Sequence, residues 1–215
     1  MRIVFQGDSI TDAGRRKNSF YDLGPGYPAL VADELCLKYP DVEFVFINRG
    51  VCGDRVERLH ERWQAEAIDL KPDILSILIG INDTWQYAET KDWETPEHYE
   101  GCYGALLSEL KEKTGAKVLI LEQYLLPDGP FADFREDVSP KITSTRRVAS
   151  QYADAYVPLD GLFAAACVGH DPKEWSEDSI HPSEAGARLI AKYYVEAICP
   201  LIDEILEREK AEKGE

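Results

Sequence analysis

The sequence is poor in the features that mark several large classes of protein. It has five cysteines, an odd number with no C-x-x-C pair, so neither a disulfide framework nor a thiolate zinc site is indicated. No apolar run is long enough to cross a membrane or to form the core of a signal peptide. These absences predict a soluble, reduced, cytoplasmic protein.

Positive charge is also scarce. The 215 residues include 24 Lys and Arg against 40 Asp and Glu, which gives a formal net charge of −16. A strongly negative surface repels polyanions, so we expect no nucleic-acid partner and no membrane partner. A small uncharged ligand is compatible with this charge. With 44% apolar and 10% aromatic residues, the chain can bury a real core, which excludes global disorder.

Five short apolar runs are spaced widely along the chain, and most are continuous and rich in β-branched residues. This pattern is typical of strands buried on both faces of a parallel sheet. The runs cover residues 3–6, 42–47, 74–79, 118–121 and 156–159. Segments with helical spacing of apolar residues lie between them, at residues 27–38, 56–70, 97–113 and 141–152.

This alternation predicts an α/β fold, namely a single-domain three-layer sandwich over residues 1–215. We expect a five-stranded parallel flavodoxin-like sheet of order 2-1-3-4-5 with helices on both faces. The last helix is predicted to start near Glu184 and to be interrupted or restarted at Pro200, which gives a C-terminal helical extension over about 200–212. Its apolar stripe at residues 201–206 either packs on the domain or forms a homo-oligomer contact.

In such a sheet, ligands bind beyond the carboxyl ends of the strands. Residues 7–12 follow the first run and place Ser9 at a strand-to-helix turn, where its hydroxyl is exposed beside helix N-terminal N–H groups. Residues 48–54 contain Gly50 and Gly53, which permit a turn whose backbone approaches a ligand. Asn82 follows the third run and carries a neutral amide donor suited to an oxyanion.

Asp178 and His181 lie three residues apart before the last helix. At this spacing the carboxylate can accept the Nδ1 proton of the imidazole, which leaves Nε2 to act as a base. Each of the four segments also fits a simpler role, because Ser, Asp and Asn cap helices and glycines favour loops. Their joint occurrence in this order supplies a nucleophile, oxyanion donors, a base and an orienting acid, which favours catalysis.

On these residues the sequence resembles the SGNH (GDSL-type) hydrolase superfamily over essentially the whole chain. The four blocks are Gly7-Asp8-Ser9-Ile10, Gly50-Val51-Cys52-Gly53, Gly80-Ile81-Asn82-Asp83 and Asp178-Ser179-Ile180-His181. The resemblance implies that Ser9 is the nucleophile, His181 the general base and Asp178 its partner. It also implies an oxyanion hole made of the Ser9 and Gly53 N–H groups and the Asn82 side chain.

Within the superfamily, the chain is most similar to acetylxylan-esterase-type carbohydrate esterases. The similarity implies a serine esterase that removes acetyl groups from carbohydrates, such as acetylated xylo-oligosaccharides, through an acyl-enzyme and without a cofactor or a metal. One alternative is a lysophospholipase- or thioesterase-type lipid acyl hydrolase on the same triad. A less favoured alternative is a metal-dependent phosphoesterase or a non-catalytic sugar-binding module. Cys52 departs from the family pattern, in which a small hydroxyl residue is common at this position.

The substrate-binding residues are predicted from the segments that follow the strands and from the subfamily resemblance. Aromatic side chains beside a site suit the apolar faces of sugar rings, and they suit acyl chains equally. We also expect the Asp8 and Asp83 side chains to act as scaffolding, which means that they hold the site in place through hydrogen bonds. The predicted substrate-binding residues are Asp8, Arg15, Tyr27, Arg55, Trp85, Tyr124 and Trp175.

Overall fold

A five-stranded parallel sheet forms the centre of the molecule, with the strand order β2-β1-β3-β4-β5. The computed structural model describes residues 1–127 and 129–214, so the predicted domain end at residue 215 lies outside the described residues. The predicted α/β class and the order 2-1-3-4-5 are confirmed. The strands are β1 (Arg2–Gly7), β2 (Val45–Gly50), β3 (Ile74–Leu78), β4 (Lys117–Leu121) and β5 (Ala155–Val157).

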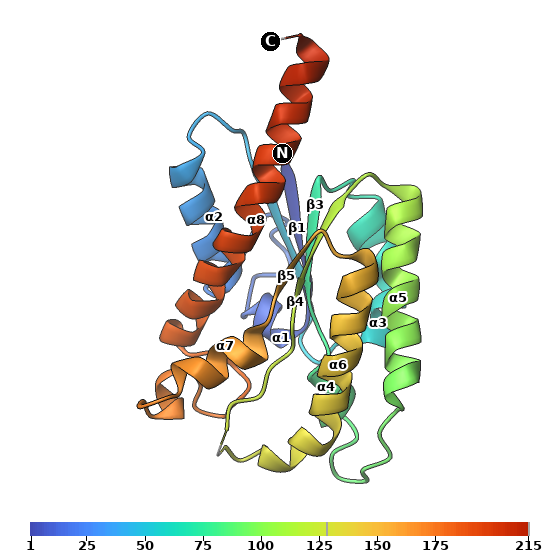
Figure 1. The fold of residues 1–215 in the computed structure, drawn as a ribbon, viewed down its shortest axis with the longest axis vertical. Helices are drawn as coiled ribbons and strands as arrows, with labels where there is room; N and C mark the ends of the chain where they lie inside the picture. The colour runs from blue at the N-terminus through green and yellow to red at the C-terminus, as the bar shows by residue number, and fades with distance from the viewer. Residues whose placement is uncertain (128, 215) are drawn as a thin grey trace.

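Helices cover both faces of this sheet, with α2, α7 and α8 on one side and α3, α5 and α6 on the other (Figure 1). Among the described residues, no helix combines the length and the apolar character needed to span a bilayer. The α-helices are α1 (Ser9–Asp12), α2 (Tyr27–Lys38), α3 (Val56–Trp63), α4 (Asn82–Trp85), α5 (Pro96–Lys113), α6 (Arg135–Tyr152), α7 (Leu159–Ala166) and α8 (Glu184–Lys213). A π-helical turn (Gln64–Ile68) continues α3, and short 3₁₀ turns lie at Ala132–Phe134 and Pro172–Glu174.

Each face of the sheet has its own hydrophobic core. Side chains alternate between the two faces of a strand, so Phe5 packs with the α2 and α8 side, whereas Val4 packs with the α3 and α5 side. Tyr194 of α8 lies 5.5 Å from Phe5 between ring centroids, and Trp63 of α3 is buried in the opposite core. Burial on both faces explains why the strands read as continuous apolar runs.

The second strand differs from its prediction. The sequence places it at residues 42–47, whereas β2 begins at Val45 and continues through Asn48 to Gly50. The polar end of this strand can be buried because its side chains find hydrogen-bond partners in the backbone of neighbouring segments. Asn48 Nδ2 donates to the carbonyls of Thr11 and Leu23, at 2.6 and 2.8 Å. The strand therefore ends at Gly50, at the edge of the sheet where Gly50 contacts α1.

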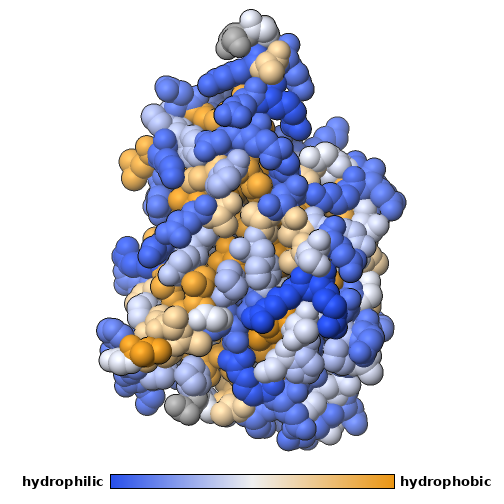
Figure 2. All heavy atoms as spheres, viewed as in Figure 1, coloured by the Kyte–Doolittle hydropathy of each residue, from blue (hydrophilic) through white to orange (hydrophobic). Residues whose placement is uncertain are grey.

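The last helix also differs from its prediction, because α8 runs through Pro200 without a break. Proline removes one backbone donor, and burial on both sides of it holds the helix together. Ile198, Leu201, Ile202 and Ile205 are all buried in the domain's own core. The apolar stripe therefore packs on the domain, and the exposed last turns of the helix, at the top of the view, are hydrophilic (Figure 2).

Candidate active site

Ser9 lies at the junction between β1 and α1, at the carboxyl edge of the sheet. Asp8 is the N-cap of α1, and its buried carboxylate accepts a hydrogen bond from the N–H of Ile10 at 3.0 Å. Burial raises the pKa of Asp8 to about 7, against the lowering effect of this hydrogen bond. The Asp8 side chain therefore fixes the turn that presents Ser9, as expected for scaffolding.

His181 and Asp178 lie opposite Ser9 on the loop before α8. Ser9 Oγ is 2.9 Å from His181 Nε2, and His181 Nδ1 is 2.7 Å from Asp178 Oδ2. With its Nδ1 proton held by the carboxylate, His181 has Nε2 free to accept the Ser9 proton. The sequence-predicted catalytic residues thus form one continuous hydrogen-bonded chain.

The Asp178 carboxylate is held on both oxygens. Oδ1 accepts from the backbone N–H groups of Ile180 (3.0 Å) and His181 (2.7 Å) and from the Ser176 hydroxyl (3.1 Å). Partial burial raises the pKa of Asp178, but the hydrogen bonds from His181 and Ile180 outweigh it and hold the pKa below its ordinary value. The group is therefore a carboxylate at neutral pH and can stabilise an imidazolium.

Ser179 takes a left-handed backbone conformation within this loop, with φ of 76°. Such a conformation is unfavourable for a residue with a side chain and tends to occur where a functional geometry requires it. Here it allows the Asp178 carboxylate to reach back to the N–H groups and the imidazole of the residues that follow it.

The predicted oxyanion donors lie around the same serine. Gly53 has φ of 81°, a left-handed conformation that favours glycine, although a Cβ there would meet no neighbouring atom. Asn82 Nδ2 donates to the carbonyl of Asp54 at 3.1 Å. Because an amide nitrogen carries two hydrogens, this bond fixes the side chain and leaves one N–H for an oxyanion.

Arg62 holds the Gly50–Gly53 turn against the sheet edge. Its guanidinium donates to the Asp54 carboxylate at 2.7 Å, to the carbonyl of Arg49 at 2.7 Å and to Gln6 Oε1 at 2.9 Å. Gly50 is needed here as well, because a Cβ on it would stand 2.3 Å from the Asp12 backbone nitrogen. The turn that carries Gly53 is therefore fixed by the protein itself, which is what a predicted oxyanion donor needs in order to stabilise a transition state electrostatically.

A buried network fixes the segment that carries Asn82. Lys141 of α6 is fully buried, donates to the carbonyl of Asp83 at 2.9 Å and pairs with the Asp137 carboxylate. Asp137 also accepts from Thr84 Oγ1 at 2.6 Å. Burial raises the pKa of Asp83 to about 7, although the N–H of Val56 and the charge of Lys141 lower it. The sequence did not predict this network, because it gave α6 only a weak helical pattern and no role for Lys141.

Replacing Lys141 by methionine is expected to lower the free energy of unfolding by about 3–5 kcal/mol, because Asp137 would remain buried without its partner. Urea denaturation of the variant and of the exposed control Lys38→Met measures this loss. The double variant Lys141→Met/Asp137→Leu should regain part of the stability. A loss of under about 1 kcal/mol, typical of an exposed ion pair, would contradict the assignment.

Two cavities meet at the Ser9–His181 pair. The first, of about 400 Å³, is lined on the oxyanion side by Ser9, Cys52, Gly53, Arg58, Asn82, Trp85, Gln86 and His181. The second, of about 560 Å³, extends between α2 and α8 and is lined by Ser9, Ile10, Ala13, Pro25, Gly26, Leu30, His181, Pro182, Ser183, Glu184, Ala187 and Arg188. A substrate with two parts on either side of a scissile bond can therefore reach the serine from both directions.

The structure divides the predicted substrate-binding residues into two groups. Trp85 lines the oxyanion-side cavity and lies 5.8 Å from the His181 ring between centroids, so it can touch a substrate. Trp175 is half-buried against His170, at 6.2 Å between ring centroids. Arg55 is tied to Tyr87 and Glu94 by hydrogen bonds of 2.8 and 3.0 Å. Of these three residues, only Trp85 is among the residues that line the two cavities.

The other four residues are buried in the protein, which corrects their predicted contact with substrate. Tyr27 and Tyr124 have no exposed surface: Tyr27 bonds to Thr11 Oγ1, and Tyr124 stacks on Phe163. Arg15 donates to the Gly50 carbonyl at 3.1 Å, and Asp8 is the helix cap described above. Sequence reasoning missed Arg58, Gln86, Leu30 and Arg188, which line the cavities and carry no motif of their own.

Replacing Asn82 by alanine is expected to lower kcat for ester hydrolysis by about 10²–10³-fold, because one oxyanion donor is lost. Steady-state kinetics on an aryl acetate measures the effect, with the exposed Asn18→Ala as the matched control. The loss should appear in kcat more than in KM, since the donor acts on charge that develops in the transition state. An equal kcat in Asn82→Ala and Asn18→Ala would remove Asn82 from the oxyanion hole.

Comparison with known proteins agrees with this geometry. The chain is 31% identical over 204 residues to an acetylxylan esterase of Geobacillus stearothermophilus, covering 92% of this chain and 93% of that protein. Crystal structures of an acetylxylan esterase from the same organism superpose with a TM-score of 0.84 over 92% of this chain and 94% of theirs, at 27% identity. They include catalytic mutants in which a serine or an aspartate is replaced by alanine.

A crystal structure described as a GDSL-like lipase, from Parabacteroides merdae, is 33% identical and superposes with a TM-score of 0.86, covering 91% of this chain and 94% of its own. The family model of the GDSL-like lipases and acylhydrolases matches residues 5–189, which include the serine, the oxyanion donors, the histidine and the aspartate described above. The chain belongs to the GDSL-like Lipase/Acylhydrolase family, and it is a carboxylic ester hydrolase.

Proposed function

We propose that the protein is a serine esterase that removes acetyl groups from carbohydrates, with acetylated xylo-oligosaccharides as substrates. The observation that carries the proposal is the chain of contacts from Ser9 Oγ through His181 to Asp178, at 2.9 and 2.7 Å. It is supported by the 31% identity to an acetylxylan esterase over nearly the full length of both chains.

The reaction proceeds in two steps. Ser9 Oγ attacks the ester carbonyl while His181 Nε2 takes its proton, and the resulting oxyanion accepts hydrogen bonds from the N–H groups of Ser9 and Gly53 and from Asn82. The C–O bond to the sugar then breaks, His181 gives the proton to the departing sugar oxygen, and the sugar leaves with a free hydroxyl while Ser9 keeps the acetyl group. Water, deprotonated by the same histidine, releases acetate and restores the enzyme.

The second cavity suits the sugar part of the substrate. Pro25, Leu30 and Ala187 offer apolar surface, and Ser183 and Arg188 offer hydrogen-bonding groups. A sugar ring has apolar faces and a rim of hydroxyl groups, so it matches a cavity of this mixed kind. The predicted cytoplasmic location would make shortened, imported oligosaccharides the substrate, and a neutral sugar is compatible with the net charge of −16.

A lipid acyl hydrolase would use the same triad, and a chain-length series distinguishes it. We expect kcat/KM to be higher for acetylated xylo-oligosaccharides and aryl acetates than for the corresponding octanoyl esters. Acetate release and ester hydrolysis are measured side by side at equal enzyme concentration. A preference for the octanoyl ester would favour the lipid-directed alternative.

A further inference from the structure

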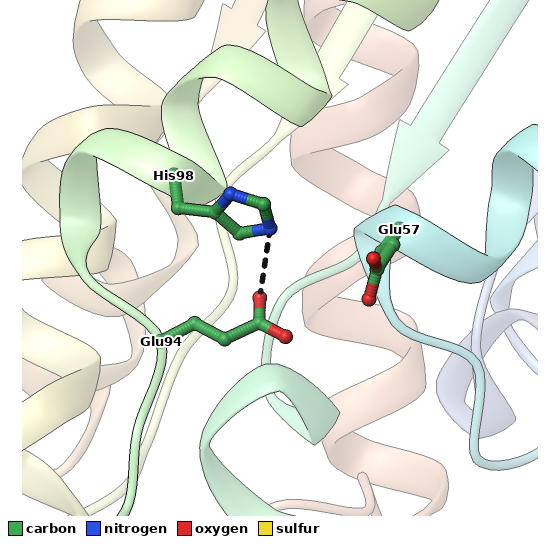
Figure 3. Close-up of side chains that lie close together, drawn as sticks. All are labelled: Glu57, Glu94 and His98. Carbon is green, nitrogen blue, oxygen red and sulfur yellow. Dashed lines mark ion pairs between the residues drawn. The ribbon is translucent and has the colours of Figure 1, made fainter.

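Three side chains of metal-ligating type meet at the start of α5, and a cysteine lies beside one of them. Glu57 comes from α3, Glu94 from the segment before α5, and His98 and Cys102 from α5 itself. Figure 3 shows Glu94 and His98 pointing toward one another, with Glu57 across from them on α3. We propose that these four residues bind one divalent transition-metal ion, with Zn²⁺ as the best match.

The distances fit a single ion. One ligand atom each from Glu57, Glu94 and His98 lies within 4.8 Å of the other two. His98 Nε2 is 3.6 Å from Glu94 Oε2 and 3.5 Å from Cys102 Sγ. A tetrahedral zinc ion with bonds of about 2.0–2.3 Å holds its ligand atoms about 3.3–3.8 Å apart, so the three ligand atoms of Glu57, Glu94 and His98 would draw together around it. Cys102 contacts His98 alone within this group, and its side chain would turn toward the ion to supply the fourth ligand.

The helix start fixes two of the four ligands. His98 and Cys102 are four residues apart, so they lie on the same face of α5. Thr95 caps this helix by accepting a hydrogen bond from the His98 N–H at 3.2 Å, and Pro96 occupies its first position. Imidazole, thiolate and carboxylate are the ligand types that zinc takes, and a mixed set of this kind is unusual for Mg²⁺ or Ca²⁺.

The charge of the site also suits a divalent cation. Arg55 contacts both carboxylates, with Glu94 Oε1 at 3.0 Å and Glu57 Oε2 at 3.6 Å, which leaves Glu94 Oε2 facing His98. The two carboxylates carry two negative charges, and Arg55 balances one of them.

Such an ion would join three segments rather than act on the ester. It would link α3, α5 and the segment that follows α4, and Arg55 connects this cluster to Tyr87 through a 2.8 Å hydrogen bond. Ser9, His181 and Asp178 are not among its ligands. The ion would therefore raise resistance to unfolding and hold the segment that follows Asn82 and Trp85.

The test uses the full chain freed of metal by a chelator and titrated with Zn²⁺ in a calorimeter. We expect one ion per chain and a rise in the thermal unfolding midpoint when zinc is added. His98→Ala and Glu57→Gln should each weaken binding by at least about 10-fold. The matched control is His170→Ala, which removes an exposed histidine with a glutamate four residues away, at 3.3 Å from Glu174.

Co²⁺ gives a second readout that does not depend on stability. The cobalt-loaded protein should show a thiolate-to-cobalt absorption band that Cys102→Ser lacks, and circular dichroism confirms that each variant is folded. Absence of saturable Zn²⁺ binding, or equal affinity in His98→Ala and His170→Ala, would overturn the proposal. Esterase activity serves as a separate measurement, so a failure here would leave the role of Ser9 untouched.

Discussion

Replacing Ser9 by alanine is expected to lower kcat for acetyl ester hydrolysis by about 10⁶-fold, the loss seen when the nucleophile of a triad is removed. The reason is structural: Ser9 Oγ is the atom that His181 Nε2 contacts, at 2.9 Å. A small residual rate should remain, because the oxyanion donors and the cavities still bind and polarise the substrate. Steady-state kinetics on an aryl acetate and on acetylated oligosaccharides measures both values.

The matched control for this variant is Ser150→Ala, which removes an exposed hydroxyl on α6. It should leave kcat unchanged. Chelation with EDTA should also leave hydrolysis by the wild type in place, because the proposed reaction passes through an acyl-serine. Hydrolysis that persists in Ser9→Ala at the wild-type rate and that EDTA abolishes would instead favour a metal-dependent phosphoesterase type of site.

Asp178→Asn is expected to lower kcat by about 10⁴-fold while leaving the fold intact. An amide at this position can present an N–H to His181 Nδ1, where the carboxylate in the wild type accepts a hydrogen bond at 2.7 Å. The imidazole would then carry its proton on Nε2 and could not accept the one from Ser9. Kinetics and thermal unfolding of the same sample separate loss of the base from loss of stability.

Asp33→Asn is the control for this second variant, because it makes the same chemical change at an exposed position on α2. We expect wild-type kinetics from it. If Asp178→Asn also kept its kcat, the carboxylate would have no part in setting the imidazole tautomer, and its hydrogen bonds would serve the loop alone.

The sequence predicted the fold, and it proposed reacting residues that the structure brings together, because both depend on local patterns. Buried parallel strands give continuous apolar runs, and the residues that follow them carry the chemistry. Ser9, Asn82 and His181 could therefore be proposed from their positions after the strands and from the family resemblance, before any contact was known. The limits of β2 were wrong because Asn48 and Arg49 are buried polar residues whose side chains donate to backbone carbonyls distant in sequence, those of Thr11 and Leu23 for Asn48 and of Phe20 for Arg49.

Substrate contacts were harder to predict because position near a motif does not tell which way a side chain points. Tyr27 and Tyr124 follow the first and fourth strands as expected, yet both point into the core. For Lys141 the error runs the other way, because a residue with no predicted role is buried in a network beside the site. A lysine in a weakly patterned helix is ordinarily exposed, and only the fold shows that Asp137 and the Asp83 carbonyl surround it.

The central claim is that acetyl groups of carbohydrates pass through a covalent bond to Ser9. Mass spectrometry of peptides from enzyme quenched in acid during turnover of acetylated xylo-oligosaccharides tests it most directly. We predict an added acetyl group on the peptide that contains Ser9, and its absence in Ser9→Ala. Release of acetate by the wild type with no acetylated Ser9, or with the acetyl group on Cys52, would contradict the claim.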